Sequence, residues 1–162
     1  MNPVPDMPAA PVIGLREITA DTVRAICDLV AAPVGYVAPN AVSIAQAHFH
    51  PEAWFRAVYA DDTPVGFVML EDSSLRVPPS AELEVGLWRF MIDARQQRKG
   101  YGRAALRLVI DDVRRRHPAL PTFLTSCVRG PQTPRPFYEA LGFVFSGELN
   151  DGEEVGRLAL RG

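Results

Sequence analysis

The chain has 162 residues, enough for one domain with a sizeable core and too few for two domains of ordinary size. Apolar residues make up 48% and charged residues 22%, so most of the chain is expected to fold. A formal net charge of −2 argues against a general nucleic-acid-binding surface and fits a neutral or cationic small partner better. There is no apolar run of about 18 residues and no secretory signal, which predicts a cytoplasmic protein that does not contact the membrane.

Cysteine and histidine patterns give no sign of a metal centre. Cys27 and Cys127 have no CxxC spacing, and we interpret them as buried thiols of a reducing compartment. His48 and His50 lie close to Glu52, but a metal ion would need further ligands in a suitable geometry. We therefore expect surface histidines and no metal.

The distribution of prolines and of apolar periodicity predicts one folded unit behind a short arm. Residues 1–11 contain four prolines and should form a loose arm, while residues 12–162 form a single domain. The expected strands are 12–18, 55–60, 65–70, 82–93, 122–128, 143–149 and 154–160. The expected helices start near 21, cover 41–48, follow residue 102 and cover 134–141. This order predicts a mixed α/β domain whose first half is antiparallel.

The segment Gln97-Arg98-Lys99-Gly100-Tyr101-Gly102 is the first candidate for binding chemistry. It follows an expected strand and opens an expected helix, so backbone N–H groups and the helix N-terminus could hold a phosphate. It has neither the Walker A spacing nor the third glycine of a dinucleotide-binding fingerprint. A surface turn that uses glycine only for its backbone freedom is the alternative.

The segment Pro136-Phe137-Tyr138-Glu139-Ala140-Leu141-Gly142-Phe143 is the second candidate. Its apolar members predict core packing on a short helix that ends at Gly142. Tyr138 is the member with chemistry to offer, because a phenol at the edge of a pocket can donate a proton to a thiolate.

Together the two segments resemble the signatures of the GNAT superfamily of acetyl-CoA-dependent N-acetyltransferases, in the family's order and spacing. The resemblance extends over nearly the whole chain after residue 11. It implies a central, mostly antiparallel sheet of about six or seven strands, splayed in the middle and flanked by about four helices. Within the superfamily, segments 37–40, 64–68 and 87–93 are similar to those of bacterial diamine or spermidine acetyltransferases.

The resemblance also implies positions for the cofactor, acetyl-CoA. Its pantetheine arm would bind the backbone of Phe90, Met91 and Ile92, and Tyr138 would be the general acid toward the CoA thiolate. Its pyrophosphate would lie on the loop made by Gln97, Arg98, Lys99, Gly100, Tyr101, Gly102 and Arg103. Many relatives carry an asparagine where this chain has Pro131, so no asparagine contact to the cofactor is expected.

Acetyl transfer needs a neutral amine, so a carboxylate must take a proton directly or through water. Glu84 and Glu82 are expected on one face of the strand that enters the site, and Glu84 is the preferred base. Tyr36 and Asn40, in the loop after the first helix, are expected to contact the acceptor.

The sequence therefore predicts an N-acetyltransferase that acts on a small primary amine, such as a polyamine or diamine, by direct attack in a ternary complex. A protein N-terminal or lysine acetyltransferase is the closest alternative. A CoA-binding sensor without turnover and a generic adapter domain are the others. A homodimer is compatible with the sequence, which does not decide the oligomeric state.

Overall fold

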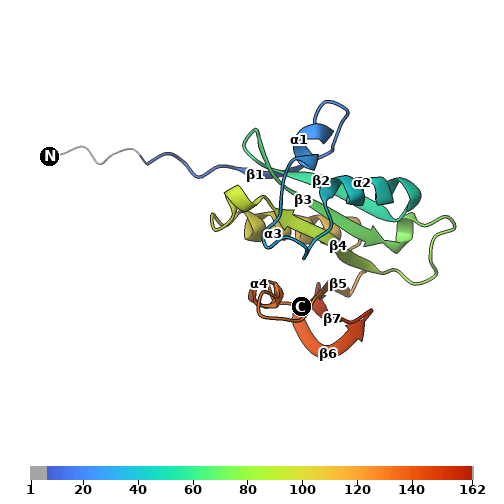
Figure 1. Cartoon of the computed structure of the whole chain (residues 1–162). Coiled ribbons are helices and arrows are strands. Elements are labelled where there is room, and N and C mark those ends of the chain that lie inside the picture. Colours follow the sequence, from blue (N-terminus) through green and yellow to red (C-terminus); the bar gives the residue numbers. More distant parts are fainter. Residues whose placement is uncertain (1–6, 162) are drawn as a thin grey trace.

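The computed structural model describes residues 7–161, which form a seven-stranded sheet with four α-helices and two short 3-10 helices (Figure 1). The sheet order is β1-β2-β3-β4-β5-β7-β6, and of the strand pairs in it β4 and β5 are parallel while the others are antiparallel. The strands are β1 (Ile13–Arg16), β2 (Ala53–Ala60), β3 (Thr63–Asp72), β4 (Val85–Ile92), β5 (Thr122–Cys127), β6 (Val144–Asn150) and β7 (Glu153–Ala159). The helices are α1 (Val23–Cys27), α2 (Asn40–Phe49), η1 (Ser73–Leu75), η2 (Ala94–Gln96), α3 (Tyr101–Arg116) and α4 (Arg135–Ala140). The mixed α/β fold is confirmed.

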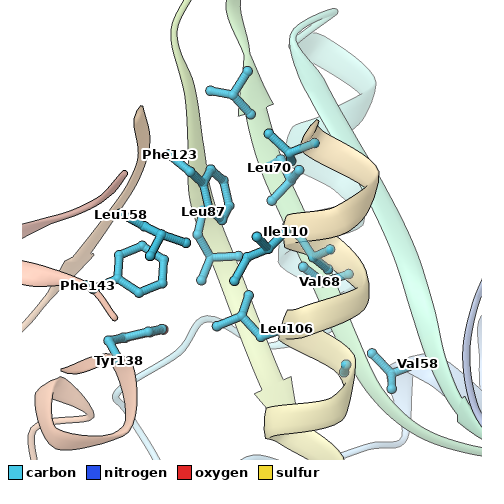
Figure 2. Packing of buried hydrophobic residues seen from close by; sticks show 14 of the residues in the cluster. Val58, Val68, Leu70, Leu87, Leu106, Ile110, Phe123, Tyr138, Phe143 and Leu158 are labelled. Atoms are coloured by element: carbon cyan, nitrogen blue, oxygen red, sulfur yellow. The ribbon is translucent and has the colours of Figure 1, made fainter. Parts of the chain in front are cut away.

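Each face of the sheet buries its own hydrophobic cluster, because side chains alternate along the strands. In β3, Val68 and Leu70 pack toward α3, whereas Phe67 and Met69 pack toward α1 and α2. Helix α3 presents an apolar stripe to the first cluster, and Figure 2 shows Leu106 and Ile110 of that stripe beside β3 and β4. A helix on each side explains why β3 is apolar on both faces.

Several element boundaries differ from the sequence-based expectation. Strand β4 begins at Val85, so Glu82 and Glu84 lie ahead of the strand and not on it. Ser73 explains the difference: its hydroxyl donates to Glu82 O at 3.1 Å and accepts from Glu84 N at 2.8 Å. These bonds take the place of ladder pairing. Residues 7–12 form neither helix nor strand, and the rest of the predicted arm lies outside the described residues.

Of the three arginines that end α3, Arg114 and Arg115 are exposed, whereas Arg116 is partly buried. Arg116 donates to the buried carboxylate of Asp72 at 2.8 Å, and His117 Nε2 lies 2.7 Å from the same oxygen. Burial would raise the pKa of Asp72, but the hydrogen bonds from Ser74 and His117 hold that pKa below its ordinary value. The pairing fixes the end of α3 against the end of β3.

The two middle strands separate soon after they meet. Strands β4 and β5 pair only at Val85–Phe123 and Gly86–Leu124, after which neither strand has a partner on that side. On the other edge of β4 the register shifts: Leu87 pairs with Leu70, whereas Arg89 pairs with Met69. The extra residue in β4 is a bulge, and a bulge bends its strand and increases the local twist. The sheet is therefore open between β4 and β5, as the resemblance implied.

The close approach of β3 to β4 leads to a test of the packing. A Cβ added at Gly66 would lie 2.5 Å from Met91 O and 2.8 Å from Ile92 Cδ1, whereas one added at Gly14 in β1 would meet nothing within 4 Å. We expect Gly66→Ala to lower the free energy of unfolding by about 2 kcal/mol or more, because backbone atoms must shift. Gly14→Ala, the matched control, should stay within about 0.5 kcal/mol of the unmodified protein in urea unfolding. Equal effects of the two substitutions would contradict this packing.

Candidate active site

A cavity of about 1240 Å³ occupies the opening between β4 and β5. Its walls come from both strands, from the loop between α1 and α2, from the segment that joins β3 to β4, from the start of α3, from α4 and from the β6–β7 hairpin. The volume exceeds that of an ordinary drug-sized pocket, so it has room for a long ligand and a second molecule beside it.

The segment from Gln97 to Arg103, called the glycine loop below, forms one end of this cavity. Gly100 is the N-cap of α3 with φ +81°, and Arg98 has φ +63°, so the backbone turns sharply into the helix. No side chain caps the helix, and its first turn contains no acidic residue. The first N–H groups of α3 are thus left for an anion, which the positive end of the helix dipole also favours.

The loop is held in place from two sides. Gln97 Nε2 donates to Ala32 O at 3.2 Å and to Ile92 O at 3.1 Å. Asp93, which is buried, accepts from Val30 N at 3.0 Å and from Arg95 Nε at 2.8 Å. These bonds join the end of β4 to the loop after α1, so this end of the cavity has its shape before any ligand binds.

The predicted loop residues do not all reach the cavity. Lys99 is absent from its lining, and its ammonium group donates to Gln96 Oε1 at 2.9 Å. The structure therefore gives Lys99 no direct place in the cavity, in contrast to the other predicted residues of the loop: Gln97, Arg98, Gly100, Tyr101, Gly102 and Arg103.

The end of β4 forms the long wall of the cavity. Phe90, Met91 and Ile92, the residues predicted to bind the pantetheine arm, all line it. Phe90 stacks on Phe137 of α4 with ring centroids 6.1 Å apart, so the two aromatic rings connect β4 to α4. Because β5 diverges, the backbone of β4 at these residues has no strand partner on the cavity side.

Tyr138 is held firmly at the opposite wall. It is 7% exposed, and its ring contacts Phe137 and Phe143 at centroid distances of 5.4 and 5.6 Å; Figure 2 shows it beside Phe143 and Leu158. Burial raises the pKa of Tyr138 to about 12, against a smaller opposing effect of the Thr125 hydroxyl. The phenol is therefore protonated at neutral pH and can act as a proton donor.

The acceptor-side predictions have different outcomes. Glu82, Glu84 and Tyr36 line the cavity, with both glutamates exposed. Asn40 does not line it: the side chain is 2% exposed and its Nδ2 donates to Ile26 O at 2.8 Å. The prediction that Asn40 contacts the acceptor is wrong, because this amide fastens the start of α2 to α1.

The polar cavity residues that the sequence did not predict include three on different strands: Arg89, Ser126 and Glu153. Ser126 Oγ donates to a Glu153 carboxylate oxygen, which joins β5 to the start of β7. The three come from strands that lie far apart in the sequence, and Arg89 depends on the bulge in β4 for its direction. Only the strand order could have brought them together.

The fold and this cavity can now be compared with known proteins. The sequence model described as the acetyltransferase (GNAT) family matches residues 23–143. The chain belongs to this family. It is an acetyl-CoA-dependent N-acetyltransferase. Among curated proteins, none matches the chain.

Solved structures of GNAT proteins superpose on most of this one. A protein of Desulfovibrio desulfuricans described as a GNAT-family acetyltransferase gives a TM-score of 0.68 at 20% identity, over 93% of this chain and 100% of its own. The ribosomal-protein-S18-alanine N-acetyltransferase of Escherichia coli gives 0.63 at 17%, over 93% and 96%. The PaiA N-acetyltransferase of Thermoplasma acidophilum, in complex with coenzyme A, gives 0.63 at 14%, over 91% and 99%. At these identities the likeness supports the fold alone.

The cavity fits the CoA of a GNAT enzyme on its own geometry. It joins an uncapped helix N-terminus, which suits a pyrophosphate, to the unpaired edge of β4, which suits an amide-containing arm. Within residues 7–161, no group of three or more His, Cys, Asp or Glu side chains is placed to hold a metal ion. None of the helices in that range combines the length and apolarity that a bilayer crossing demands.

The environment of Tyr138 predicts an anomaly in the titration of the four tyrosines. With a pKa near 12, Tyr138 stays protonated while an ordinary phenol ionises near pH 10. We expect the phenolate absorbance gained between pH 8 and 10.5 to be the same in the unmodified protein and in Tyr138→Phe. A loss of about a quarter of the signal in the variant would show that Tyr138 titrates normally.

Proposed function

We propose that this GNAT enzyme transfers the acetyl group of acetyl-CoA to the primary amine of a small molecule, with polyamines and diamines as the candidate class. The observation that supports the proposal most is the continuity of the cavity. It runs from the N-terminus of α3, past the free edge of β4 and the Tyr138 phenol, to a mouth that contains exposed carboxylates.

On the donor side, backbone N–H groups from Arg98 to Arg103 would bind the pyrophosphate, and the guanidinium groups of those two residues add positive charge there. Gln97 would act by holding the loop, since its amide is already committed to two carbonyl groups. The free backbone edge from Phe90 to Ile92 would hydrogen-bond the pantetheine amides and polarise the thioester carbonyl.

On the acceptor side, Glu84 would take a proton from the ammonium group, directly or through a water, to give the neutral amine. Glu82 and Tyr36 also line the cavity and would bind the rest of the acceptor. The carboxylates at the mouth favour a cationic molecule over an anionic one.

Acetyl-CoA would supply the acetyl group as a thioester: the nitrogen–carbon bond forms as the carbon–sulfur bond breaks, and the nitrogen loses one further proton to solvent. Tyr138 donates its phenolic proton to the departing sulfur, and solvent restores that proton after the products leave. The chain needs no covalent acetyl intermediate. Burial raises the pKa of Cys127, the cysteine on the cavity wall, so its thiol is poorly suited as a nucleophile.

A protein N-terminus is the second candidate acceptor. A solved GNAT neighbour of similar fold is described as a ribosomal-protein-S18-alanine N-acetyltransferase, a name that gives a protein as the acceptor. A protein acceptor would have to place a peptide backbone in the cavity mouth. The short peptides in the substrate panel described next distinguish the two candidate acceptors.

Release of CoA, followed with a thiol reagent, tests the proposed function. We expect turnover with at least one small primary amine in a panel of diamines, polyamines, aminoglycosides and short peptides. No CoA release with any small amine, together with turnover of a peptide, would support the protein acceptor instead. No CoA release with any member of the panel, together with a CoA-dependent rise in Tm, would indicate a CoA-binding sensor.

Substitution of Tyr138 tests the assignment of the general acid. We expect Tyr138→Phe to lower kcat about 100-fold, because a positioned proton donor contributes roughly 10²- to 10⁴-fold. The KM for acetyl-CoA should change little, because the ring and its packing are kept. Phe143→Leu is a control within the same aromatic cluster. It should lower Tm and leave kcat close to that of the unmodified enzyme. Unchanged turnover in Tyr138→Phe would remove the catalytic role.

A further inference from the structure

Arg89 is a charged cavity residue to which the proposed mechanism gives no role. It lies in β4 at the register shift, one residue before the segment that would hold the pantetheine arm. Its guanidinium donates to Gln46 Oε1 of α2 at 3.4 Å, so the side chain is on the α2 side of the sheet. This is the face opposite to α3, whose N-terminus forms the phosphate end.

The guanidinium of Arg89 lacks a charged hydrogen-bond acceptor among residues 7–161. Its two bonds go to neutral oxygens, those of Gln46 and of the Trp88 backbone at 3.2 Å, and its Nε is buried without any partner. Burial lowers the pKa of Arg89 below its ordinary value, and the negative charge of Glu153 acts in the opposite direction. A half-buried cation of this kind is stabilised by an anion that binds in contact with it.

The other arginine on the acceptor side differs in this respect. Arg76 lines the same cavity, but its guanidinium is hydrogen-bonded to the carboxylate of Glu71. The remaining cavity arginines, Arg98 and Arg103, belong to the glycine loop at the phosphate end. Arg89 is thus the acceptor-side arginine of the described residues that is left without a carboxylate.

The carboxylates of Glu82 and Glu84 line the same cavity, and both are exposed. One cavity therefore presents two kinds of charge: carboxylates at its mouth and a guanidinium on its α2 side. A molecule that carries only ammonium groups satisfies the first and is repelled by the second. A molecule with both an amine and a carboxylate matches the two together.

We propose that the natural acceptor bears a carboxylate beside its amine, as a diamino acid does, and that Arg89 binds this carboxylate. The proposal rests on the proposed N-acetyltransferase function and narrows its diamine class. Arg89 Nη1 and Nη2 would form the paired bonds that suit a planar carboxylate, while Glu82 and Glu84 hold the cationic end. Glu153, the carboxylate whose charge acts on Arg89, accepts a hydrogen bond from Ser126 of β5 and forms no ion pair with Arg89 in the described residues.

Substrate pairs that differ only in the carboxylate test this proposal. Free L-lysine is 1,5-diaminopentane with one added carboxylate, and free L-ornithine bears the same relation to 1,4-diaminobutane. We expect kcat/KM to be at least tenfold higher for each amino acid than for its diamine, since a hydrogen-bonded charge pair contributes about that factor or more. In Arg89→Gln, the ratio within each pair should fall at least tenfold.

Arg76→Gln is the matched control, because its guanidinium already has a carboxylate partner, and it should leave the ratio within about twofold of the original. Arg89→Lys keeps the charge but not the paired geometry and should give an intermediate ratio. Preference of the unmodified enzyme for the diamines would overturn the proposal, as would an unchanged ratio in a folded Arg89→Gln. If Arg89→Gln fails to fold, the kcat/KM ratios of the unmodified enzyme still test the proposal. No turnover of any of the four amines, or of any amine in the wider panel, would instead refute the proposed function.

Discussion

The site depends on the separation of β4 from β5 after only two register pairs. A continuous ladder would bury the edge of β4 and leave no cavity at the centre of the sheet. The bulge at Leu87–Arg89 bends β4 away, while β3 holds its other edge over the whole strand. On the β3 side every residue of β4 except Trp88 keeps a register partner, and the unpaired backbone groups on the β5 side become available to a ligand.

Polar bonds outside the sheet keep this opening in a defined shape. Gln97 and Asp93 tie the end of β4 to the loop after α1, and Ser73 ties the segment before β4 to η1. At the other end of α3, Arg116 pairs with the buried Asp72. Both ends of β4 and both ends of α3 are thus anchored, so the glycine loop and the free edge of β4 are fixed relative to one another before a ligand binds.

The sequence predicts the parts of this enzyme that depend on local spacing. The glycine loop and the helix that follows it can be predicted from neighbouring residues, and the family signatures supply the splayed sheet. Asn40 was misplaced because its partner, the carbonyl of Ile26, belongs to another helix. Glu82 and Glu84 were assigned to a strand because alternation cannot reveal that Ser73 would bind their backbone. Arg89 and Glu153 line one cavity because of the strand order and the bulge in β4, which no local sequence pattern encodes.

Amide hydrogen exchange with and without acetyl-CoA tests directly whether the opening beside β4 is the cofactor site. We expect binding to slow exchange in two segments, the β4 edge at 90–92 and the glycine loop at 98–103, because their N–H groups would gain acceptors. Strand β1, on the far side of the sheet, should be unchanged. Protection confined to other segments, or saturable binding of acetyl-CoA with no change in either segment, would contradict a cofactor site formed by the separation of β4 from β5.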